Sequence, residues 1–172
     1  MKISNFPMVL LAVALFVATQ ARGEIQIPEE DQIVANYQTM EEFRAFYDEV
    51  EAALKAEDVD RIMALYADDY LHQGITKRQL RFMWLEIFNA YDDLYSIHAF
   101  SNIHVTGGDA ILNCTGALMG IERKGKDFLA VDRWIQLNHW LTRVDGKWKM
   151  VGGASHTGAT LKESKDDSHP LF

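Results

Sequence analysis

The chain has 172 residues, of which 48% are hydrophobic, and a formal net charge of −8. Because the chain carries a net negative charge, it should not attract nucleic acid or anionic lipid, and we expect neither as a partner. Cys114 is the only cysteine, which excludes an intramolecular disulfide. About 150 residues remain after a leader is set aside, enough for one domain with a buried core.

The first residues have the pattern of a secretory signal peptide. Lys2 gives a positive start, residues 8–18 (MVLLAVALFVA) form the apolar run, and small residues offer cleavage after Ala21 or after Gly23. The apolar run is shorter than the ~20 residues that span a bilayer, so we expect no stable membrane anchor after cleavage. The sequence therefore predicts a signal peptide over residues 1–23 and an exported protein, periplasmic or secreted.

Residues 24–38 are predicted as an N-terminal arm, and three amphipathic helices follow it. Thr39, with a Glu three residues later, has the capping-box pattern and predicts the start of the first helix. Asp58 is predicted to cap a shorter second helix, and Thr76 with Gln79 a third. Apolar residues recur at helical spacing in each segment, which predicts one buried face per helix.

From Tyr95 the apolar spacing changes to two, which predicts long strands joined by tight turns. The predicted turns are Gly107-Gly108, Lys124-Gly125 and Asp145-Gly146. The last turn places Leu141 opposite Met150, and the second places Cys114 opposite Ile135. Both registers put apolar residues of three strands on one face, so we predict a curved antiparallel sheet with the helices packed on that face.

The same registers distribute the polar residues between the two faces of the sheet. The residues predicted on the helix-covered face are Arg133, His139, His156, Cys114 and Trp148. The open face carries Asp132, Trp134 and Trp140 among polar residues, so it is either solvated or an interface, and we expect a homodimer through it. A single β-bulge in the long strand would exchange Asp132 and Arg133 between the faces.

The sequence resembles the NTF2-like superfamily and, within it, the SnoaL-like group. The resemblance rests on LYADDY at residues 65–70 and on the closing hairpin RVDGKWK at residues 143–149, and it covers about residues 39–157. It implies an α+β, NTF2-like cone containing a pocket, over residues 39–160, followed by a charged C-terminal tail at residues 161–172. The superfamily contains enzymes as well as binding and assembly domains, so this fold does not define an activity.

No catalytic set of the superfamily transfers intact to this sequence. In ketosteroid isomerases the general-base Asp lies five residues after a similar Ala-Asp-Asp, and the resemblance places Gly74 there. His72 has the same side-chain parity as Gly74, so it is predicted to point into the pocket as a different base. Limonene epoxide hydrolases use Arg-x-Asp, whereas Asp132 and Arg133 are adjacent here and in the opposite order.

The residues support a pocket that combines proton-transferring groups with aromatic walls. A neutral His in a desolvated cavity can move a proton near neutral pH, and a nearby Arg can stabilise an enolate or bind a carboxylate. We predict catalytic roles for His72, His139 and Asp132; the alternative for each His is a hydrogen bond within the core. The predicted ligand-binding residues are Tyr66, Tyr70, Trp84, Arg133, Trp148 and His156.

We expect no cofactor and no metal. The sequence has no Gly-rich phosphate loop, and no His pair has the i, i+4 spacing of helical metal ligands. A metal site would have to be assembled across strands, for example from His139 and His156. Cys114 is interpreted as a buried core residue, because nothing beside it in the sequence would lower its pKa.

Three functions follow from this pattern and stay open. The first is binding of a small, partly apolar molecule, and the second is a cofactor-independent acid/base enzyme of the isomerase, dehydratase or cyclase type. The third is a dimeric assembly domain whose cavity is vestigial. The sequence leaves open whether the protein is an enzyme, and it does not identify the ligand.

Overall fold

A computed structural model describes residues 24–26, 33–153 and 171 of the chain. The helices are α1 (Tyr37–Ala56), α2 (Val59–Met63) and α3 (Lys77–Ala90). The strands are β1 (Glu24–Gln26), β2 (Ile33–Val34), β3 (Tyr66–His72), β4 (Ile75–Thr76), β5 (Tyr91–Thr106), β6 (Asp109–Glu122), β7 (Phe128–Val144) and β8 (Lys147–Gly152). The predicted signal peptide, most of the predicted tail, and His156 lie outside the described residues.

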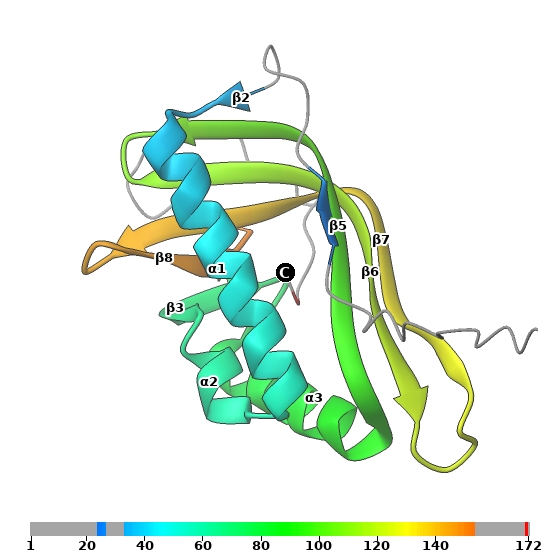
Figure 1. The fold of residues 1–172 in the computed structure, drawn as a ribbon. Helices are drawn as coiled ribbons and strands as arrows, with labels where there is room; N and C mark the ends of the chain where they lie inside the picture. The colour runs from blue at the N-terminus through cyan, green and yellow to red at the C-terminus, as the bar shows by residue number, and fades with distance from the viewer. Residues whose placement is uncertain (1–23, 27–32, 154–170, 172) are drawn as a thin grey trace, which may run out of the picture.

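The strands form one mostly antiparallel sheet in the order β1-β5-β6-β7-β8-β3-β4, and β2 also pairs with β5. The three long strands β5, β6 and β7 bend together, and α1 crosses their concave side while α2 and α3 lie at one end (Figure 1). Two short strands of the predicted arm, β1 and β2, pair in parallel with β5. The architecture confirms the predicted α+β cone of helices on a curved sheet.

Side-chain caps define where the helices begin. Asn36, in extended conformation, accepts a hydrogen bond from the Thr39 backbone N–H at 2.8 Å and caps α1. The prediction of Thr39 as the cap was wrong, because Thr39 already lies within the first turn. Asp58 caps α2, and Thr76 forms a capping box with Gln79 at the start of α3, as predicted.

The strand registers agree with the sequence near the turns and depart from it farther away. Leu141 lies opposite Met150, as predicted. Cys114, however, lies opposite Leu137 instead of Ile135, because β7 contains two irregularities in its pairing with β6. One of them is at Gln136, whose φ is 52°. An extra residue in one strand reverses the facing of every side chain beyond it.

Because of the bulge at Gln136, the side chains of β7 just before this residue face the opposite side of the sheet from the one predicted. Trp134 is 1% exposed and belongs to the main hydrophobic core, whereas Ile135 is 75% exposed. Trp140 stays on the other face, where it is buried with Ala67 and Val151 in a small separate cluster. The prediction that Trp134 lies on the open face was therefore wrong, whereas Trp140 does lie on that side of the sheet; the homodimer stays a prediction.

Leu171 lies inside the cone. It is 3% exposed and packs with the main core, and its carbonyl oxygen accepts a hydrogen bond from the Tyr66 hydroxyl. Residue 171 of the predicted tail is thus part of the packed structure.

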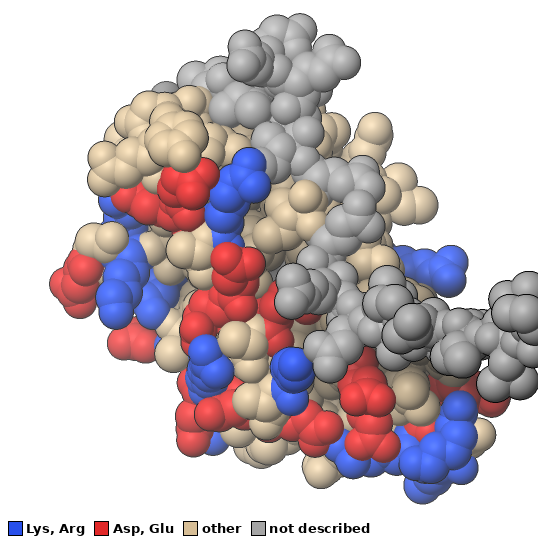
Figure 2. Space-filling view, viewed as in Figure 1, with Lys and Arg blue, Asp and Glu red and all other residues tan. Residues whose placement is uncertain are grey.

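Charged side chains of both signs share the helical side of the molecule. Figure 2 shows acidic and basic groups interspersed over this face. Arg81 pairs with Asp60 at 2.7 Å, and Arg123 pairs with Glu57 at 2.6 Å. The described residues of this face do not form the continuous basic surface that binds a phosphate backbone. Among the described residues, no helix combines the length and apolar character needed to cross a membrane.

Candidate functional site

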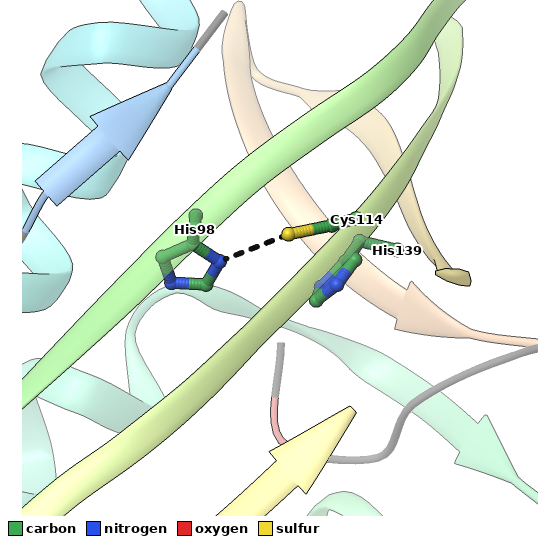
Figure 3. A group of neighbouring side chains, drawn as sticks. All are labelled: His98, Cys114 and His139. Atoms are coloured by element: carbon green, nitrogen blue, oxygen red, sulfur yellow. Dashed lines mark hydrogen bonds between the residues drawn. The ribbon is translucent and has the colours of Figure 1, made fainter. Parts of the chain in front are cut away.

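Three buried side chains from adjacent strands meet on the concave face of the sheet. His98 of β5, Cys114 of β6 and His139 of β7 each offer one ligating atom, and these atoms lie within 4.8 Å of one another. All three residues are at most 1% exposed. Figure 3 shows the two rings on either side of the thiol, with His98 Nδ1 at 3.6 Å from Cys114 Sγ. We call these three residues the His–Cys cluster.

A β-bulge at Ser101 brings His98 to the same face as Cys114. From the Gly107-Gly108 turn the pairing of β5 with β6 is regular as far as Asn102 opposite Asn113. It then shifts, so that Phe100, rather than Ser101, lies opposite Cys114. Without this shift, His98 would point to the outer face.

A chain of hydrogen bonds connects the cluster to helix α1. The Glu51 carboxylate accepts hydrogen bonds from the backbone N–H of Ser96, at 2.9 Å, and from the Ser96 hydroxyl. Because Ser96 donates its single hydroxyl proton to Glu51, its oxygen accepts from His98 Nε2–H, at 2.9 Å. The pattern assigns the proton of a neutral His98 to Nε2. The lone pair of Nδ1 therefore faces Cys114.

Cys114 is held in a polar but dry environment. The Trp134 indole N–H donates a hydrogen bond to its sulfur at 3.4 Å. Burial nevertheless raises the pKa of the Cys114 thiol to about 12. At neutral pH the free side chain is a thiol that can donate to His98 Nδ1, and it lacks the depressed pKa of a reactive cysteine.

Tyr47 of α1 closes the cluster from the helical side. Its ring lies 4.5 Å from that of His98, centroid to centroid, and the residue is 1% exposed. Burial raises the pKa of Tyr47 well above its ordinary value, and proximity to Cys114 and Tyr66 raises it further. Among the described residues, the Tyr47 hydroxyl has no hydrogen-bond partner. Buried polar groups are nearly always paired, so this hydroxyl calls for an explanation.

Three of the predicted ligand-binding residues lie together inside the cone. Tyr66 and Tyr70 meet edge to face with centroids 5.2 Å apart, and Trp84 donates its indole N–H to the Tyr66 hydroxyl at 3.3 Å. Burial raises the pKa values of both tyrosines. These residues form an aromatic wall, and their roles in ligand binding stay predictions.

The structure separates the other predicted site residues. His72 is 3% exposed at the end of β3, and Asp132 is partly buried opposite Leu118. Arg133 is exposed, because the bulge exchanged it with Asp132 in the way foreseen as an alternative. Trp148 lies under the start of α1, where its indole N–H donates to Glu42 at 2.9 Å. Among the predicted residues, only His139 belongs to the His–Cys cluster.

Sequence reasoning missed His98, Ser96, Glu51 and Tyr47, and it treated Cys114 as core alone. Ser96, His98 and Phe100 follow one another at intervals of two. This spacing could have indicated that all three face the interior from one strand. No local pattern in the sequence marks the bulge that aligns this row with Cys114.

Comparisons with known proteins define the fold. No family model matches the sequence, and no curated protein matches it. A conserved protein from Planctomyces limnophilus has a similar structure, with a TM-score of 0.57 and 15% identity over 68% of this chain and 94% of that one. Aln2 from a Streptomyces species gives 0.55 and 11%, over 69% and 89%. A ketosteroid isomerase-like protein from Erwinia carotovora atroseptica gives 0.51 and 13%, over 68% and 94%.

These likenesses, together with the helices on a curved sheet, show an NTF2-like fold. They match the resemblance found in the sequence and cover about two thirds of the chain. Identities this low define the architecture alone, because this fold carries many unrelated functions. The function has to be argued from the interior of the cone.

Proposed function

We propose that this protein binds a small, partly apolar molecule in the interior of its cone. The observation that carries the proposal is the buried Tyr47 hydroxyl, which has no hydrogen-bond partner among the described residues. Leaving such a group unpaired costs about 1 to 3 kcal/mol, and a ligand with one polar group would remove this cost. The Tyr47 ring packs against His98, so we propose that polar recognition takes place next to the His–Cys cluster.

The side chains inside the cone favour a ligand with mixed character. The aromatic wall of Tyr66, Tyr70 and Trp84 offers apolar contact, while the Tyr47 hydroxyl offers a polar group. Small-molecule sites are typically apolar, with a few fixed polar groups that set the orientation of the ligand. The NTF2-like fold is consistent with such a site, since one structurally similar protein is described as ketosteroid isomerase-like.

Native mass spectrometry of the chain purified without added ligand tests the proposal. We expect a defined small-molecule adduct that is lost on denaturation, and we expect less of it on Tyr47→Phe, which removes the unpaired hydroxyl. His104→Ala is the control, because His104 lies on the same strand and bonds to Thr106 away from the cluster. A wild-type spectrum without adduct, under conditions that preserve the fold, would favour an assembly domain instead.

Export and homodimer formation are further parts of the proposal. Export is supported by Lys2, the apolar run at residues 8–18 and the small residues near Ala21. The same native spectrum of protein recovered from an exporting host reports the mature N-terminus and the number of chains in the particle. An intact leader or a monomer would contradict export or the dimer, respectively, without affecting ligand binding.

Acid/base catalysis without a cofactor is the second candidate function. It is favoured by the hydrogen bonds from Glu51 through Ser96, which leave His98 Nδ1 unprotonated and facing the Cys114 thiol. A general base needs such an oriented lone pair. Once the adduct supplies a substrate, Glu51→Gln should lower kcat more than it weakens binding. Equal losses in turnover and affinity would favour binding alone.

A further inference from the structure

We propose that His98, Cys114 and His139 bind zinc or a similar thiophilic divalent metal ion. This inference concerns the metal alone and does not rest on the proposed small-molecule ligand. It revises the expectation that no metal is bound. The site is assembled across strands, as that expectation required, but it uses His98 and Cys114 in addition to His139.

The distance between the first two ligands already fits a tetrahedral zinc site. Zinc binds Cys sulfur at about 2.3 Å and His nitrogen at about 2.05 Å, so a tetrahedral angle between them separates the two atoms by about 3.6 Å. His98 Nδ1 and Cys114 Sγ are 3.6 Å apart. His139 completes a group whose ligating atoms all lie within 4.8 Å of one another, a separation that a change in ring orientation can reduce.

The hydrogen-bond network presents His98 in the form that a metal requires. A metal-bound His usually donates its second ring N–H to an acceptor that fixes the tautomer. Here Nε2–H donates to Ser96, which is held in turn by the Glu51 carboxylate. The remaining Nδ1 lone pair faces Cys114. This is the arrangement by which outer residues orient a metal ligand.

Charge and proton balance are consistent with a divalent ion at this point. Binding replaces the Cys114 proton, which leaves to solvent, while both imidazoles bind as neutral ligands. The thiolate cancels one of the two metal charges, and Glu51 lies two hydrogen bonds from the metal position. Three protein ligands also leave a fourth position for water or another small ligand, as in zinc sites that are not closed.

The test is metal binding by the full mature chain, purified without a histidine tag and stripped with a chelator. We expect one Zn²⁺ per chain by calorimetry, and Co²⁺ should give the near-ultraviolet charge-transfer band of a cobalt–thiolate bond. Cys114→Ser should abolish the band and weaken zinc binding at least about 100-fold. Glu51→Gln should weaken it by about 10- to 100-fold, the usual effect of losing an outer residue.

Matched variants keep the result interpretable. His104→Ala should bind zinc like the wild type, because it alters a histidine of β5 outside the cluster. His139→Gln provides a second test of the site if Cys114→Ser does not fold, as judged by circular dichroism. Absence of zinc binding to the folded wild type would overturn the proposal, and so would wild-type affinity in a folded Cys114→Ser or His139→Gln variant. Tyr47→Phe should weaken the small-molecule adduct but retain zinc, so the two proposals fail separately.

Discussion

The two faces of the β5–β7 sheet both carry polar side chains but use them differently. On the outer face, the Asn113 side chain donates to the Gln136 carbonyl at 2.9 Å and to the Asn138 side chain at 3.0 Å. On the inner face, polar groups run in one line from Glu51 through Ser96 and His98 to Cys114. The outer network stabilises the sheet within reach of water, whereas the inner line ends where the buried Nδ1 lone pair of His98 faces the Cys114 thiol.

The difference shows that burial, rather than the number of polar groups, makes a side chain of this fold suitable for proton transfer or metal binding. An exposed amide exchanges its protein partner for water at little cost, so its hydrogen bonds contribute modestly. A buried imidazole has no such alternative, and its proton stays where the network places it. The inner face can therefore hold an oriented base or a metal ligand.

The largest expected effect comes from adjacent residues that the Gln136 bulge sends to opposite faces. Trp134→Ala should lower the free energy of unfolding by about 3 to 5 kcal/mol, because it empties a buried position. Ile135→Ala should change it by less than about 0.5 kcal/mol, because Ile135 is 75% exposed. Urea denaturation of both variants measures the contrast. Equal losses, or a larger loss for Ile135→Ala, would favour the unbulged register and remove Trp134 from its contact with Cys114.

The second effect concerns Cys114 on the inner face. Because this thiol is buried, we expect the free energy of unfolding to fall at alkaline pH. Burial raises the pKa of this thiol from 9.0 to about 12. Between these values the unfolded thiol loses its proton while the folded one keeps it, so stability falls as pH rises, by about 1.4 kcal/mol per pH unit. Below pH 9.0 this contribution is constant.

Comparison of the wild type with Cys114→Ser isolates the thiol. Tyr47, Tyr66 and Tyr70 also have raised pKa values and are present in both proteins, so the difference reports Cys114 together with its effect on the pKa of Tyr47. Urea denaturation of metal-free protein from about pH 8 to about pH 10.5 should show a steeper loss for the wild type. Parallel curves would mean that the thiol is solvated, contrary to the structure.

A smaller effect is expected for the unpaired hydroxyl of the inner face. Tyr47→Phe should raise the free energy of unfolding of the ligand-free protein by about 1 kcal/mol, because it removes a buried polar group without removing a hydrogen bond. The same change should weaken ligand binding. Thermal and urea denaturation measure the gain, and a clear loss of stability would show that the hydroxyl is already paired.

The smallest effect is expected on the outer face. Asn138→Ala removes the side-chain acceptor of Asn113 at a partly buried position, so it should lower the free energy of unfolding by about 0.5 to 1 kcal/mol. Zinc binding should not change, because Asn138 and the adjacent His139 point to opposite faces of β7. A loss of metal affinity in this variant would show that the two faces are coupled.

Local sequence determined most of the elements of this protein. The caps at Asp58 and Thr76 and the turn at Asp145-Gly146 form as predicted, because each depends on residues within a few positions of one another. The alternation of apolar residues also predicted a curved sheet under three helices. These features, with the short motifs at residues 65–70 and 143–149, were enough to predict the NTF2-like cone.

Only the tertiary structure decided which side chains meet inside that cone. The bulges at Ser101 and Gln136 reverse the facing of the residues beyond them. No turn or capping pattern in the sequence predicts either bulge. A bulge is favoured by the packing of the whole curved sheet, which a short stretch of sequence does not encode. Through these two positions the fold brings His98 to Cys114 and turns Trp134 inward, and the candidate site follows from them.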